Sequence, residues 1–136
     1  MLAMNTYPRA YIEACRTASV ARMKRYRAVA ETADANVLAA FETDFCNGQV
    51  LALECFFMHR TRAIEGKDGN PANEVRLLAA ALMAGSGRMA VDKTIKYDPA
   101  KSVLGLKVGD TIALTAGDFD RLADAYFTEI SKRFAE

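Results

Sequence analysis

The stretch HRTRAIEGKDGNPANEVR, residues 59–76, decides how the chain folds because it separates two long helical patterns. Gly66 suits the C-cap of a helix, and the pair Asp68-Gly69 suits a turn that needs a positive φ angle. Asn70 is a favoured N-cap residue, and Pro71 is favoured at the first position of the helix that follows. The stretch, here called the corner, therefore predicts a helix, a tight polar loop and a second helix.

Hydrophobic periodicity and capping residues extend this prediction to the whole chain. We expect helices over residues 8–33, 35–64, 71–85 and 116–134, with a small β-hairpin or extended segment over 91–114. The last helix has the clearest pattern, since its apolar residues from Phe119 to Phe134 recur at spacings of three and four behind a capping box of Thr115 and Asp118. The sequence predicts a mainly α-helical single domain of four helices.

The second predicted helix carries an apolar stripe interrupted by a glycine. Gly48 lies between Phe45 and Ala52 on this stripe, and a glycine in mid-helix costs about 1 kcal/mol relative to alanine. We expect it to allow a neighbouring helix or subunit to pack closely. Because this stripe and the apolar face of the last helix exceed what a small bundle easily hides, we also expect a homodimer or another homo-oligomer.

Composition excludes several classes of protein. The 136 residues include 18 basic and 17 acidic ones, so the net charge of +1 gives no general attraction to nucleic acid or anionic membranes. The basic run RMKRYR, residues 22–27, fans around its helix, and we interpret it as a solvated, partly paired face. No window is apolar enough to span a membrane, the first residues lack the basic and apolar regions of a signal peptide, and the three cysteines form no disulfide framework, so we expect a cytoplasmic protein.

The corner carries more charge than a helix connection requires. We expect a non-enzymatic binding or regulatory module in which it binds a small anionic ligand or a protein partner, at the free N–H groups of the helix that begins at Pro71. Arg62 and Lys67 would supply charge, and Asn70 and Asn73 would supply directional hydrogen bonds. The loop matches neither a Walker A motif nor the spacing of an EF-hand.

Two other functions stay open from the sequence. The first is a small enzyme that uses His59 with Cys55 or Glu65, since a thiol and an imidazole at i, i+4 share a helix face. A single histidine cannot supply a di-iron bundle, the zinc ligands are incomplete, and nothing favours haem on His59, so we predict no metal site and name no cofactor. The second is a purely structural oligomer.

Two phrases of the chain resemble a known family. HRTRAIEGKDGNPANEVR and DPAKSVLGLKVGD, together with the closing amphipathic helix, are similar to a family of small uncharacterised bacterial proteins, over roughly the last two thirds of the chain. The resemblance implies a bacterial protein. It assigns no activity, cofactor or residue role.

Overall fold

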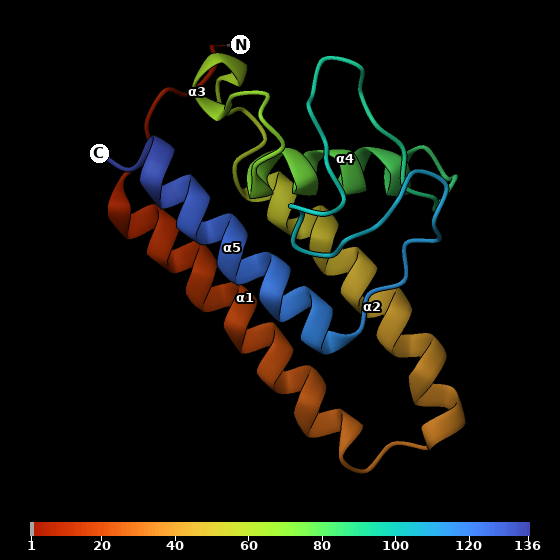
Figure 1. Cartoon of the computed structure of the whole chain (residues 1–136). Coiled ribbons are helices and arrows are strands. Elements are labelled where there is room, and N and C mark those ends of the chain that lie inside the picture. Colours follow the sequence, from red (N-terminus) through yellow and green to blue (C-terminus); the bar gives the residue numbers. More distant parts are fainter. Residues whose placement is uncertain (1) are drawn as a thin grey trace.

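The computed structural model describes residues 2–136, and this part of the chain is mainly helical (Figure 1). Its helices are α1 (Arg9–Ala30), α2 (Ala35–Phe56), α3 (Arg62–Glu65), α4 (Pro71–Met83) and α5 (Ala116–Phe134). Helices α1 and α2 form an antiparallel hairpin, α5 lies along α1, and α4 crosses the C-terminal half of α2 (Figure 1). The prediction of a mainly helical fold is confirmed. The prediction of four helices did not include the short helix α3.

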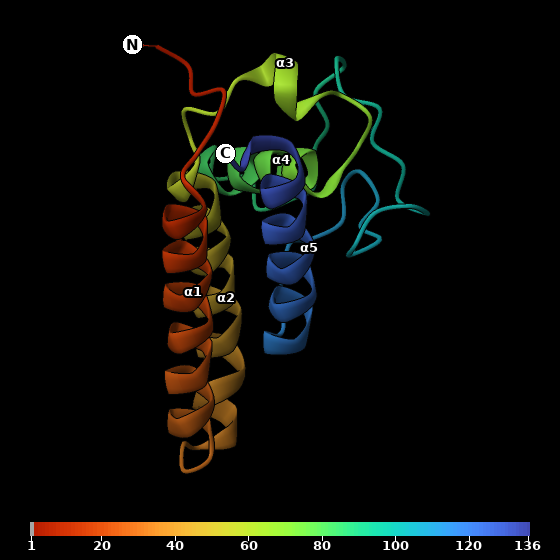
Figure 2. The same ribbon diagram turned by 90° about the vertical axis from the view of Figure 1, so that its left-hand side faces the viewer.

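The α1–α2 hairpin reaches beyond the N-terminal end of α5, as Figure 2 shows. Helix α1 begins at Arg9 behind Pro8, whose side chain makes no capping hydrogen bond, and ends at Ala30, three residues before the predicted end. Asp34 caps α2, since its carboxylate accepts hydrogen bonds from the N–H groups of Asn36 and Val37. The second helix of the hairpin therefore begins at a standard N-cap residue.

The prediction of one helix over residues 35–64 was wrong, because α2 ends at Phe56. Beyond it the backbone pairs with the N-terminal segment. The N–H of Met4 donates to the carbonyl of His59 at 2.7 Å, and the N–H of Thr61 donates to the carbonyl of Met4 at 2.9 Å. These bonds replace the helical ladder, and the chain returns to helix only over α3. No local breaker residue marks this point in the sequence.

The core lies where α5 packs against the other long helices. All the apolar residues of the predicted α5 stripe are buried, and the capping box of Thr115 and Asp118 is present, so both predictions are confirmed. The buried residues of α5 belong to one apolar cluster with residues of three other helices. These include Ile12 and Met23 of α1, Val50 and Leu53 of α2, and Val75 and Leu78 of α4.

The expectation that Gly48 lets another helix of the chain pack closely was wrong. An added Cβ at Gly48 would meet no atom within 4 Å, so this glycine does not allow a close approach of another helix of the chain. Met83, the last residue of α4, is exposed. The apolar face of α5 packs mainly against the other helices of the chain.

Residues 84–115 form an irregular excursion, and the described part of the chain contains no β-hairpin. The backbone pairing in this segment is an isolated antiparallel bridge between Arg88 and Thr111. Around it, Met89 N–H donates to the Asp110 carbonyl at 2.8 Å, and Gly109 N–H donates to the Met89 carbonyl at 2.8 Å. The prediction of a hairpin or extended segment over 91–114 was wrong: the segment is irregular, and its backbone pairs with residues 87–89, outside the predicted range.

Side chains on the helices hold this excursion in place. The buried carboxylate of Glu74 on α4 accepts hydrogen bonds from the N–H groups of Val103 and Leu104 at 2.8 and 3.0 Å. Asn47 on α2 donates to the Ile112 carbonyl at 2.9 Å and accepts from the Leu114 N–H at 3.2 Å. Helix residues thus replace the strand partners that the excursion lacks.

Candidate functional site

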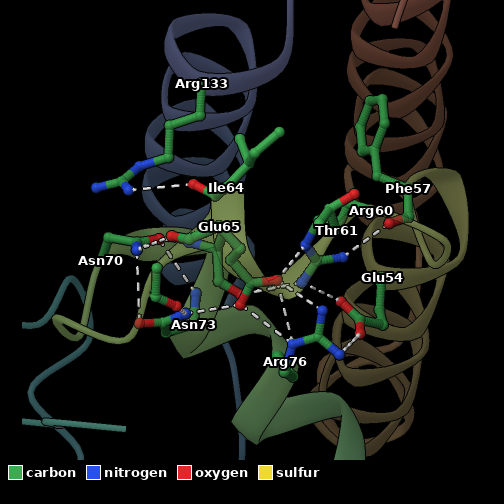
Figure 3. Close-up of polar contacts among 12 residues, drawn as sticks. Glu54, Phe57, Arg60, Thr61, Ile64, Glu65, Asn70, Asn73, Arg76 and Arg133 are labelled. Atoms are coloured by element: carbon green, nitrogen blue, oxygen red, sulfur yellow. Dashed lines mark hydrogen bonds and ion pairs between the residues drawn. The ribbon is translucent and has the colours of Figure 1, made fainter. Parts of the chain in front are cut away.

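The corner closes over a buried ion cluster of Arg60, Glu65 and Arg76 (Figure 3). Arg60 Nε donates to Glu65 Oε1 at 2.7 Å. Arg76 donates two hydrogen bonds to the same carboxylate, from Nη2 to Oε1 at 2.6 Å and from Nε to Oε2 at 3.1 Å. The side chains of Arg60 and Glu65 are 0% exposed, whereas that of Arg76 is 20% exposed, so this corner cluster reaches solvent only at Arg76.

Arg60 is the centre of the corner cluster because it contacts four elements of the chain. Its guanidinium also donates to the carbonyls of Phe57 at 3.0 Å and Ala72 at 3.2 Å and to the hydroxyl of Tyr126 at 3.3 Å. Glu54 Oε1 lies 2.8 Å from Arg60 Nη2 but is not aligned for a hydrogen bond, so it contributes charge. One arginine thereby joins the end of α2 to α3, α4 and α5.

The loop side of the corner is satisfied internally as well. Asn70 Oδ1 accepts hydrogen bonds from the N–H groups of Ala72 at 2.8 Å and Asn73 at 3.3 Å. These are among the N–H groups that we expected to bind an external anion. Asn73 Nδ2 donates to Glu65 Oε2 at 2.6 Å, and Asn70 Nδ2 donates to the Glu65 carbonyl at 2.8 Å. Both asparagines are buried and bind the chain's own groups.

Glu65 is ionised in this setting. Burial raises the pKa of its carboxyl, but the hydrogen bond from Arg76 and the positive charges of Arg60 and Arg76 outweigh burial, so the pKa lies below its ordinary value. Glu74, one helix turn beyond Asn70, behaves in the opposite way: burial raises its pKa, and the two N–H donors only partly compensate. The corner thus already contains an anion, which the fold itself supplies.

Glycine at 69 lets the loop approach the excursion. Gly69 has φ +86°, and an added Cβ would lie 2.4 Å from the carbonyl oxygen of Lys96. The N–H of Lys96 donates to the carbonyl of Lys67 at 2.8 Å. A side chain at Gly69 would therefore collide with backbone as well as strain φ.

The structure divides the four predicted ligand-binding residues into two pairs. Asn70 and Asn73 lie inside the corner, whereas Arg62 and Lys67 lie on its surface. Arg62 has one charged neighbour among the described residues, Asp92, with 3.9 Å between Arg62 Nη2 and the carboxylate. The prediction of an anion site at these four residues stays a prediction, and the surface pair is the part that faces solvent.

A pocket of about 280 Å³ opens beside the corner cluster, on the side of the N-terminal segment. Its lining residues, which define what we call the anion pocket, are Leu2, Ala3, Met58, His59, Arg60, Arg62 and Arg76. Sequence reasoning missed Arg76 as a site residue. The spacing of Asn73 and Arg76, three residues apart on one helix, was the available signal that both could reach the same group.

The residues of the enzyme hypothesis are differently placed. Cys55 is exposed on α2, but His59 lies in the turn beyond the end of that helix, so the i, i+4 helical spacing assumed for them does not apply. The Glu65 carboxylate is buried and held by three residues, which leaves it no contact with a substrate. Across residues 2–136, no group of three or more potential metal ligands comes together.

The basic run on α1 does not form a stacking surface for bases. Tyr26 is buried, and its hydroxyl donates to Glu42; burial and this bond raise its pKa to about 12. Arg27 pairs with Asp120 of α5 at 2.6 Å. Arg22 lies over the Phe56 ring at 5.8 Å. The aromatic residue of the run is therefore unavailable to a nucleic acid.

No family model, curated protein or solved structure matches this chain. Within the part of the chain that the structure describes, no helix is long and apolar enough to cross a bilayer. The residues themselves must therefore indicate the function.

Proposed function

We propose that the protein is a non-enzymatic binding module that takes a small organic anion into the anion pocket. The observation that carries the proposal is the convergence of Arg60, Arg62, Arg76 and His59 on one open cavity of about 280 Å³. Guanidinium groups suit carboxylates and phosphates because their planar donors match two oxygens at once.

Donor capacity in the anion pocket is concentrated in two arginines. Arg76 uses Nε and Nη2 on Glu65, while its Nη1 has only a distant charge contact, 3.8 Å to Glu54 Oε2. Arg62 has only the long contact to Asp92. Arg60 has no spare donor, since its nitrogens are bonded to the chain, so it acts by shaping the wall of the pocket.

Charge balance limits the ligand to a small anion. Glu54 and Glu65 offset the charges of Arg60 and Arg76, whereas Arg62 has only the 3.9 Å contact to Asp92 and is the least compensated cation of the pocket wall. The remaining lining is apolar, from Leu2, Ala3 and Met58. A short carboxylate or phosphate with a small apolar portion fits this combination of one forked donor and an apolar wall.

Calorimetric titration with butyrate, acetate and inorganic phosphate tests the proposal. We expect saturable binding that is strongest for butyrate, because acetate and phosphate lack the apolar portion. Arg62→Gln should weaken it at least tenfold, while Lys67→Gln serves as the matched control: Lys67 is an exposed cation of the same corner, outside the pocket lining.

Equal losses in the two variants would indicate general charge attraction and contradict the assignment of the pocket. Loss in Lys67→Gln alone would move the site to the loop. If none of the three anions binds the wild-type protein at millimolar concentration, the proposed function is wrong.

A further inference from the structure

A groove of about 450 Å³ runs between α1 and α5, away from the corner. Its floor is mainly apolar and consists of Ser19 and Met23 from α1 and Phe119, Ala123 and Phe127 from α5, all buried. Val20 lines the α1 side, and its side chain is 62% exposed. A valine this exposed beside an apolar floor is a surface that association can cover.

The two walls of the groove carry opposite charge. Arg16, Lys24 and Arg27 line the α1 side, and Asp120 and Asp124 line the α5 side. Two ion pairs cross the groove, Arg16 with Asp124 at 3.1 Å and Arg27 with Asp120 at 2.6 Å. Most of these four side chains are well exposed, Asp124 by 77%, so they are accessible to a second molecule.

We infer that the groove is the interface of a homodimer, in which α1 of each copy lies over α5 of the other. A two-fold axis parallel to the groove exchanges its walls and leaves positions along the groove unchanged. Because Arg16 and Asp124 already face each other across the groove, this axis places Arg16 over the partner's Asp124. The basic wall then meets the acidic wall twice.

Steric fit favours the same axis. It brings the exposed side chain of Val20 over the α5 wall of the second copy, where Ala123 is the smallest apolar residue of the floor. A two-fold axis across the groove would instead set cations on cations and carboxylates on carboxylates, which disfavours that dimer. Helices α1 and α5 of the two copies would form a four-helix arrangement around the apolar floor.

The first test is the mass in solution at tens of micromolar protein, measured by size exclusion with light scattering. We expect twice the chain mass of 14.9 kDa. Val20→Glu should shift the protein to the monomer, since a carboxylate would be buried at the centre of the interface. Val108→Glu is the matched control, because Val108 has the same exposed fraction of 62% and lies on the excursion.

Charge exchange identifies the occupant as a second copy. One variant, Arg16→Asp with Arg27→Asp, makes both walls acidic; the other, Asp120→Arg with Asp124→Arg, makes both basic. Each alone should be monomeric because like charges oppose. An equimolar mixture should form a heterodimer, since both contacts then join an acidic wall to a basic one. Circular dichroism verifies that each variant is folded.

Three results would overturn the inference. A wild-type monomer at this concentration removes the dimer. A dimer that survives Val20→Glu and both charge variants has its interface elsewhere. A dimer that is lost in Phe41→Glu but kept in Val20→Glu would place the interface at the exposed end of the α1–α2 hairpin, where Phe41 is 48% exposed. The groove and the anion pocket share no lining residue, so the dimer can be tested separately from anion binding.

Discussion

The corner cluster and the α1–α5 groove use the same chemistry, arginine paired with carboxylate, for opposite purposes. At the corner, Arg60 and Glu65 are 0% exposed, and every oxygen of Glu65 has donors from the same chain. Across the groove, Asp124 is 77% exposed and holds Arg16 through a single contact. Burial converts an ion pair into a fixed part of the fold, whereas exposure leaves it free to exchange partners.

The energies of the two regions differ accordingly. A buried pair pays a large desolvation cost that only complete hydrogen bonding offsets, so loss of one partner leaves a charge with no compensation. An exposed pair contributes little to the free energy of unfolding, because water solvates each charge when its partner is removed. Variants that remove one charge in each region measure this difference directly.

The largest effect should come from Arg60→Met. The change strands the buried Glu65 carboxylate and removes donors to Phe57 and Ala72, so we expect the free energy of unfolding to fall by about 3–5 kcal/mol. Urea denaturation followed by circular dichroism measures it. The double variant Arg60→Met, Glu65→Leu should lose less than the sum of the single losses. Strict additivity would show that the two side chains do not act as a pair.

The next effect should come from Asn70→Ala. It removes the cap of α4 and also leaves the buried Glu65 carbonyl without its donor, so we expect a loss of about 1–2 kcal/mol. Asp34→Ala is the matched control, because Asp34 caps α2 with two N–H contacts at an exposed position. A loss equal to that of Asp34→Ala would contradict a further role for Asn70 in the corner.

Acid should destabilise the protein through the corner. The pKa of Glu65 is lowered on folding, so its stabilisation is present above the ordinary glutamate pKa of about 4.3 and is lost as pH falls through the lower folded value. The effect of Glu74 on stability has the opposite sign. Its pKa is higher in the folded than in the unfolded protein, so folding takes up a proton at pH values between the two pKa values. Chemical denaturation at a series of pH values, repeated with Glu74→Gln, should show a steeper acid loss in the variant.

The smallest effect on stability should come from Asp124→Asn. At submicromolar protein, we expect the free energy of unfolding to change by less than about 1 kcal/mol, since the pair with Arg16 is exposed. The same change at tens of micromolar should raise the dimer dissociation constant several-fold. A stability loss comparable to that of Arg60→Met would erase the distinction between the two regions.

Local signals were sufficient to predict much of the fold. The α5 stripe, its capping box, and the Asn70-Pro71 start of α4 follow from short-range sequence rules, and the structure contains all of them. The end of α2 could not be predicted, since it results from pairing between Met4 and residues 59–61, more than fifty positions away. The same limit explains the excursion, whose partners lie on distant helices.

The interior of the corner could not be predicted from the sequence. The charged residues of the corner are evident in the sequence, and from them we expected Asn70 and Asn73 to face a ligand. The structure shows that Glu65 occupies that position from within the chain. Only side-chain packing could reveal this, because Glu65 turns inward to Arg60 and Arg76, which lie five and eleven positions away in the sequence.

The anchoring of the excursion by helix side chains has a consequence for the order of folding. Ile112 lies 65 positions from Asn47, and Val103 lies 29 positions from Glu74. These contacts close long loops, and the segment has only an isolated bridge to nucleate it. The helices must therefore assemble first, and the excursion is the last part of the chain to acquire protection against hydrogen exchange.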